Sequence, residues 1–107
     1  MNENDVQNKR RQNEEEATAR RARILGLVYL DTRDFEREIP LVRNVLEKDQ
    51  MHKEFIIPLQ KGEEGVPYQF MVTSQTPRHT IEKMTQEYND AGLRIEFYLI
   101  SDSAYQV

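Results

Sequence analysis

The chain has 107 residues, of which 37% are apolar and 32% are charged, and its formal net charge is −4. This length suits one domain with a modest core, and the negative charge argues against nucleic acid as a partner. The absence of cysteine excludes disulfides and thiolate metal sites. The N-terminal residues lack the pattern of a signal peptide, and the longest nearly apolar run, residues 24–30, is too short to span a membrane. These features predict a cytoplasmic protein.

The N-terminal segment is polar and charged. Residues 1–13 contain almost no sizeable apolar side chains, so we expect a disordered arm there and a single domain over residues 14–107. From Glu14 the composition favours a helix, which Gly26 ends. Arg20, Arg21 and Arg23 lie in its last turns, where they complement the helix dipole. They are also a candidate patch for phosphate or an acidic protein, although a solvated helix end is the simpler interpretation.

The middle of the chain alternates short strands and helices. Residues 27–30 are β-favouring and predict a strand followed by a polar loop. A short helix is expected to begin near Pro40, to carry an apolar stripe over residues 41–46 and to end in the polar residues 47–50. Residues 55–59 predict a second strand, in which Pro58 indicates a sheet edge or a bulge.

The second half shows the clearest periodicity. Residues 67–74 alternate, with Tyr68, Phe70 and Val72 on one face, and they form a predicted hairpin with the preceding strand. Thr76 is expected to be the N-cap of a helix that turns Ile81, Met84 and Tyr88 toward the core. Residues 93–100 alternate again, with Leu93, Ile95, Phe97 and Leu99 facing the core. The predicted class is α+β: a small mixed sheet of three or four strands, covered by two or three helices, with a flexible charged N-terminal arm.

Candidate chemistry is sparse. The Gly62–Gly65 segment fits the G-x-x-G pattern of KH modules, but it lies between two predicted strands and carries two acidic residues that would repel phosphate. The two histidines, His52 and His79, fall in different elements, and solvated histidines are the simpler interpretation than a metal site. No histidine is placed beside a serine by a known motif, and the chain contains no P-loop motif. We therefore expect no catalytic residue, metal or cofactor, and a chain that is not an enzyme.

The order of several short motifs resembles a known family. The segment ARILGLVYLD (Ala22–Asp31) resembles the "A-x-x-L-G-L-P-Y-V-D-L" pattern in the N-terminal domains of type II secretion and type IV pilus assembly ATPases. Ile39-Pro40, the IIPL segment (Ile56–Leu59), the VTSQTP segment (Val72–Pro77) and AGLRI (Ala91–Ile95) follow in the family's order. The chain departs from the family at Val28, where the family has proline, and before Pro77, where the family has an acidic residue. It also lacks the "R-L-G-x-x-L" repeats through which some members bind cyclic di-GMP, so that ligand is not carried over.

The resemblance implies a docking domain. In that family, such domains link the motor ATPase domain to the cytoplasmic domain of inner-membrane secretion or pilus assembly proteins, which would place this chain peripherally at the inner membrane through its partner. The first candidates for partner binding are the outward groups Arg94, Glu96 and Tyr98 with Arg78, and the second are Arg20, Arg21 and Arg23.

Two other classes stay open. One is a free-standing regulatory or adaptor protein with the same kind of α+β fold and an unrelated partner. The other is a small-ligand sensor, for example of a nucleotide, that uses a pocket between helix and sheet.

Overall fold

The computed structural model describes residues 3–34, 42 and 45–105. The elements in chain order are α1 (Glu3–Leu25), β1 (Val28–Tyr29), the 3-10 turn η1 (Thr32–Asp34), α2 (Lys48–Glu54), β2 (Ile56–Gln60), β3 (Tyr68–Val72), α3 (Arg78–Asp90), β4 (Ile95–Leu99) and α4 (Asp102–Tyr105). These elements confirm the predicted α+β class.

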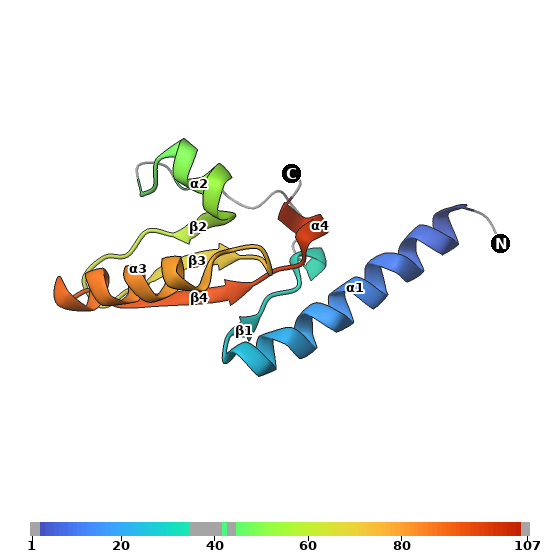
Figure 1. The fold of residues 1–107 in the computed structure, drawn as a ribbon, viewed down its shortest axis with the longest axis horizontal. Helices are drawn as coiled ribbons and strands as arrows, with labels where there is room; N and C mark the ends of the chain where they lie inside the picture. Colours follow the sequence, from blue (N-terminus) through green and yellow to red (C-terminus); the bar gives the residue numbers. More distant parts are fainter. Residues whose placement is uncertain (1–2, 35–41, 43–44, 106–107) are drawn as a thin grey trace.

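One four-stranded mixed sheet organises the fold (Figure 1). Its strand order is β1-β4-β3-β2; β1 and β3 both pair with β4 in parallel, whereas β2 and β3 form the predicted antiparallel hairpin. The register of β2 shifts between Pro58 and Gln60, and β2 is an edge strand. Both the edge and the irregularity suit a proline, which has no N–H to donate to a neighbour.

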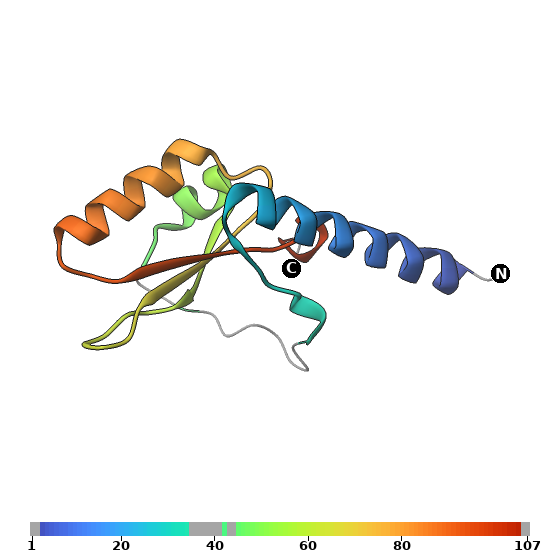
Figure 2. The same cartoon turned by 90° about the horizontal axis from the view of Figure 1, so that it is seen from below.

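The main core lies between the sheet and α3, which covers one face of it (Figure 2). The alternation predicted for β3 and β4 is confirmed here, because Phe70, Val72 and Leu99 are fully buried on this face. From α3, Met84 and Tyr88 pack against them as their helical spacing predicts. The Phe70 ring lies edge-on to Tyr88, with ring centroids 5.8 Å apart. Aromatic packing of this kind adds to the burial of apolar area.

The opposite face of the sheet carries a second, smaller cluster. Met71, Ile100 and Ala104 are buried together, with Tyr105 and other half-buried apolar groups packed around them. The short helix α4, which the sequence did not predict, therefore covers the carboxyl ends of β3 and β4 on this face.

The N-terminal helix is longer than predicted. It begins at Glu3, so the described residues 3–13, for which the sequence predicts a disordered arm, are helical in the structure. Low apolar content suggested disorder, yet the segment is rich in strong helix formers, and Arg11–Glu15 and Gln12–Glu16 interact one turn apart. The N-terminal half of α1 extends beyond the rest of the fold (Figure 1).

The second helix also differs from its prediction. The start of the helix expected from Pro40 lies outside the described residues, because residues 40, 41, 43 and 44 are not among them. Val45 and Leu46 form a bend, and they pack against the main core as the apolar stripe predicts. The helix α2 instead begins within residues 47–50, where the predicted helix was expected to end, and it continues to Glu54. Phe55 follows it in the left-handed conformation with φ 52°.

Two local predictions in the second half need correction. Pro77, not Thr76, occupies the N-cap of α3. The Thr76 hydroxyl instead accepts the N–H of Thr73 (2.9 Å) and donates to the Phe55 carbonyl (2.6 Å), which ties the β3–α3 turn to the start of β2. Leu93 is exposed rather than in the core, because β4 begins only at Ile95.

Candidate functional site

Two neighbouring acids hold the C-terminal half of α1 on the rest of the fold. The carboxylate of Glu15, only 2% exposed, accepts hydrogen bonds from the Tyr29 hydroxyl and from Arg11 Nε, both at 2.6 Å. Ala22 lies two turns further along the same face and is buried in the main core. Glu14 binds the start of α4, where it accepts the Ser103 N–H (2.9 Å) and hydroxyl (2.6 Å). These contacts fix the end of α1 beside strand β1.

The pKa values of two of these groups shift in opposite directions. Hydrogen bonds from the Ser103 side chain and backbone favour the charged form of Glu14 and lower its pKa, although partial burial opposes them. Burial raises the pKa of Tyr29, and the hydrogen bond to the Glu15 carboxylate adds to this effect. At neutral pH, Glu14 is therefore an acceptor and Tyr29 a donor, as the contacts require.

The three predicted arginines of α1 are all exposed, and the structure separates them. Arg21 points into a cavity between α1 and the sheet, whereas Arg20 and Arg23 are not among the residues that line it. None of the three forms an ion pair with a carboxylate of the described residues.

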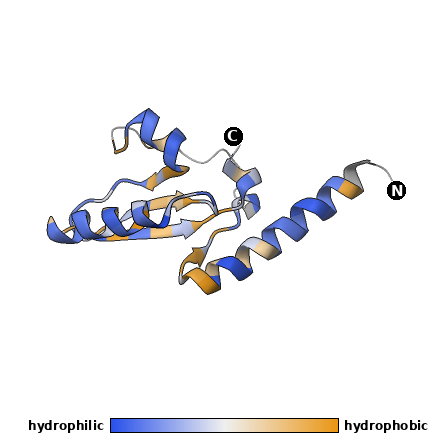
Figure 3. Cartoon of the chain, viewed as in Figure 1, coloured by the Kyte–Doolittle hydropathy of each residue, from blue (hydrophilic) through white to orange (hydrophobic). Residues whose placement is uncertain are grey.

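The exposed apolar side chains beside these arginines were not predicted. Ile24 is 84% exposed, Val28 60% and Leu25 45%. Figure 3 shows the hydrophobic end of α1 continuing into β1, an edge strand of the sheet. We call this surface the α1–β1 corner and define it by Arg20, Arg23, Ile24, Leu25 and Val28. One signal was present in the sequence: at about 100° per residue, Ile24 lies nearly opposite Ala22 on a helix, so both cannot face the core.

The other predicted group is only partly assembled. Glu96 and Tyr98 lie on one face of β4 beside Gln69 of β3, whose amide donates to the Glu96 carboxylate (2.9 Å) and to the Tyr98 hydroxyl (3.1 Å). Arg94 precedes β4 at the end marked by the Tyr68–Ile95 pair, and its carbonyl accepts the Tyr68 N–H.

Arg78 does not join this group. It begins α3 just after the opposite end of β3, and it pairs with Glu82 on its own helix at 3.2 Å. The expected neighbourhood of Arg78 and Arg94 is therefore wrong. Of this surface, Gln69, Glu96 and Tyr98 hydrogen-bond to one another.

The two histidines lie apart from each other in the structure. His52 and His79 are exposed on separate helices, α2 and α3. Within residues 3–34, 42 and 45–105, no group of three or more histidine, aspartate or glutamate side chains is arranged to hold a metal ion. No helix among these residues is long and apolar enough to cross a membrane.

The comparisons with known proteins give no relative. No family model matches the chain, and neither a curated protein nor a solved structure is significantly similar to it.

Proposed function

We propose that this chain is a non-catalytic protein-docking module, and that its α1–β1 corner binds an acidic, amphipathic segment of a partner. The observation that carries the proposal is the exposure of Ile24, Leu25 and Val28 within five residues of one another. Single exposed apolar residues are ordinary, but a group of them rimmed by charge is typical of an interaction site.

The positive charges at the corner favour a partner segment that carries negative charge. Arg20 and Arg23 flank the apolar group and form no ion pair with a described carboxylate. Protein interfaces combine an apolar centre with a polar rim, and arginine is enriched in them. An amphipathic helix with leucines on one face and glutamates beside them satisfies both parts of the corner. Most of the binding energy would come from the apolar side chains, and the arginines would set the orientation and the association rate.

The corner is a better candidate than the β4 surface. Glu96, Tyr98 and Gln69 already hydrogen-bond to one another, so a partner would have to replace contacts that exist. At the corner, a partner would cover apolar area that now faces water. Each side chain that becomes fully buried would contribute about 1.5–3 kcal/mol to the binding free energy.

The sequence resemblance supplies a specific form of this proposal. On that reading, the partner is the cytoplasmic domain of an inner-membrane secretion or pilus assembly protein, and the module connects it to a motor ATPase domain. The chain itself would then be cytoplasmic and held at the inner membrane through this partner. Titration with the purified cytoplasmic domain of such an assembly protein tests this form. If that domain does not bind but a simple acidic helix does, the secretion or pilus interpretation is refuted and the docking proposal stands.

A designed peptide tests the docking proposal itself. The probe is a fluorescent, helix-forming peptide of about 18 residues with a leucine face flanked by glutamates, and its control carries lysines in place of the glutamates. We expect the acidic peptide to bind and the basic one not to bind, with an affinity that falls as salt is added.

Two variants locate the binding surface. Ile24→Glu should weaken binding by about 30-fold, the equivalent of about 2 kcal/mol. The matched control is Val66→Glu, which changes another exposed apolar residue, in the β2–β3 loop away from β1, and should leave the affinity unchanged. Equal affinity of both variants for the peptide, or equal binding of the acidic and basic peptides, would refute the proposal.

A further inference from the structure

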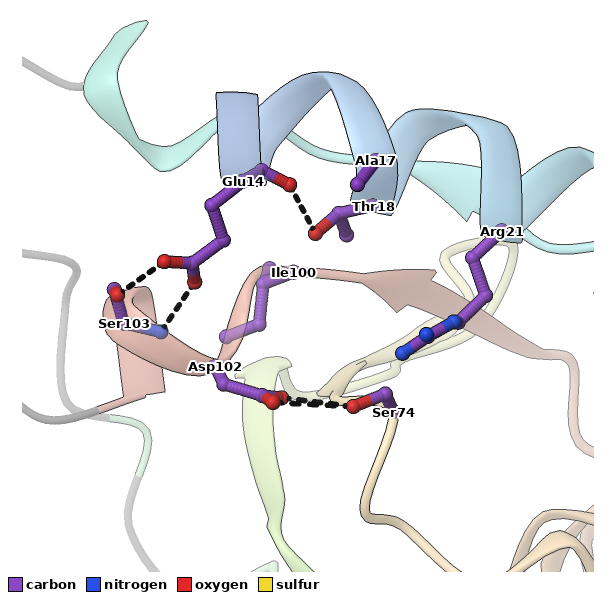
Figure 4. A pocket seen from close by; sticks show the side chains of 8 residues that line it. All are labelled: Glu14, Ala17, Thr18, Arg21, Ser74, Ile100, Asp102 and Ser103. Carbon is purple, nitrogen blue, oxygen red and sulfur yellow. Dashed lines mark hydrogen bonds between the residues drawn. The ribbon is translucent and has the colours of Figure 1, made fainter. Parts of the chain in front are cut away.

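A cavity of about 310 Å³ lies between α1 and the carboxyl ends of β3 and β4. Its walls come from three separate segments: one face of α1, the turn after β3 at Ser74, and the turn after β4 at Ile100–Ser103 (Figure 4). The cavity is distinct from the α1–β1 corner, whose residues do not line it.

The position of this cavity is one that binding sites favour. In sheets with parallel strands, ligands bind in the crevice outside the carboxyl ends of the strands, where the chain leaves in different directions. Here β3 and β4 are parallel neighbours, and their following segments diverge, one toward α3 and the other into α4. The helix α1 closes the crevice from the side.

Opposite charges face each other across the cavity. The guanidinium of Arg21 points into it, toward Ser74 (Figure 4). On the other wall, the Asp102 carboxylate accepts the Ser74 hydroxyl, with oxygen–oxygen distances of 3.0 and 3.2 Å. Arg21 and Asp102 do not form an ion pair, and no described acceptor binds the guanidinium. The site therefore presents a separate anchor for each sign of charge.

Glu14 adds a second carboxylate at the end of the cavity. Its oxygens bind the N–H and hydroxyl of Ser103, which fixes its position, and its pKa is lowered by these bonds. With one guanidinium and two carboxylates, the lining carries a formal charge of −1. This balance disfavours nucleotides and other polyanions, and it favours a ligand that carries one anionic group and at least one cationic group.

We propose that this cavity binds a free α-amino acid with a basic side chain. The α-carboxylate would pair with Arg21 in a bidentate contact, the α-ammonium would bind Asp102, and the side-chain cation would lie toward Glu14. The volume is at the lower end of the range for small-molecule sites, which suits a ligand of this size. The small side chains of Ala17 and Thr18 on α1 leave the room for it.

Titration calorimetry with L-lysine tests the proposal, with L-glutamate and cyclic di-GMP as ligands that should bind far more weakly. Arg21→Gln should lower the affinity for lysine by at least about tenfold, because a charge-assisted contact is lost. Arg20→Gln is the matched control, since it removes the neighbouring arginine of the same helix, which does not line the cavity, and it should leave the affinity unchanged.

Changes to the ligand test the same contacts in the unaltered protein. Lysine methyl ester lacks the carboxylate and 6-aminohexanoic acid lacks the α-ammonium, so each should bind at least about tenfold more weakly than lysine. Binding of the ester as tightly as lysine, equal loss in the two arginine variants, or no heat with any amino acid would overturn the proposal.

Discussion

The hydrogen bond between Tyr29 and Glu15 should contribute strongly to stability, because it satisfies a buried charge. Glu15 is 2% exposed, and its two oxygens each have one partner at 2.6 Å: the Tyr29 hydroxyl and Arg11 Nε. Tyr29→Phe removes the hydroxyl donor and leaves one buried oxygen of the Glu15 carboxylate without a hydrogen-bond partner. Such a loss costs about 1.5–3 kcal/mol, since the acceptor is charged and shielded from water.

Urea unfolding of the two proteins at neutral pH measures this cost. A loss of about 2 kcal/mol in the free energy of unfolding corresponds to a fall in melting temperature of roughly 8–15 °C for a chain of this size. The control is Tyr98→Phe, which removes a hydroxyl bonded to Glu96 on an exposed face and should cost less than about 1 kcal/mol. If Tyr29→Phe and Tyr98→Phe lose the same small amount, Glu15 does not depend on Tyr29 and the account of α1 docking fails.

Three further predictions concern stability. Hydrogen bonds from Ser103 lower the pKa of Glu14 in the folded chain, so the ionised Glu14 contributes its full stabilisation above about pH 4.5 and loses it as the pH falls through the folded pKa. Glu14→Gln should therefore show a smaller drop in the free energy of unfolding between about pH 6 and pH 3, measured by urea midpoints. Phe70→Ala should cost about 3–5 kcal/mol in the same assay, because Phe70 is fully buried, and a loss below about 1 kcal/mol would contradict the described core. Gly62→Ala should destabilise by about 1–3 kcal/mol, since a Cβ there would overlap the Tyr68 ring, and Tyr68→Ala in the same chain should remove the penalty.

The strands and the third helix could be predicted because local patterns determine them. Alternation over residues 67–74 and 93–100 defines which side chains of β3 and β4 face the core, and helical spacing does the same for Met84 and Tyr88. Pro58 predicted either a sheet edge or a bulge, and β2 has both features. In each case, the information lies within a few neighbouring residues.

The placement of α1 could not be predicted in the same way. From the sequence, Glu14 and Glu15 are simply acidic residues near a helix start, where they complement the helix dipole. Nothing local indicates that Glu15 is buried against Tyr29, or that Glu14 binds Ser103, which lies 89 residues away. The cavity has the same origin, since Arg21, Ser74 and Asp102 meet only after the three segments pack. The exposure of Ile24 also depends on this packing, because it is the burial of Ala22 that turns the opposite side of the helix toward solvent.

Chemical-shift mapping with the acidic amphipathic peptide locates the docking surface residue by residue. In an isotope-labelled chain, we expect the amide signals of residues 20–28 to shift as peptide is added, while those of α3 and the β2–β3 loop stay unchanged. Shifts concentrated around Arg94, Glu96 and Tyr98, with none at residues 20–28, would contradict the claim that the α1–β1 corner is the docking surface.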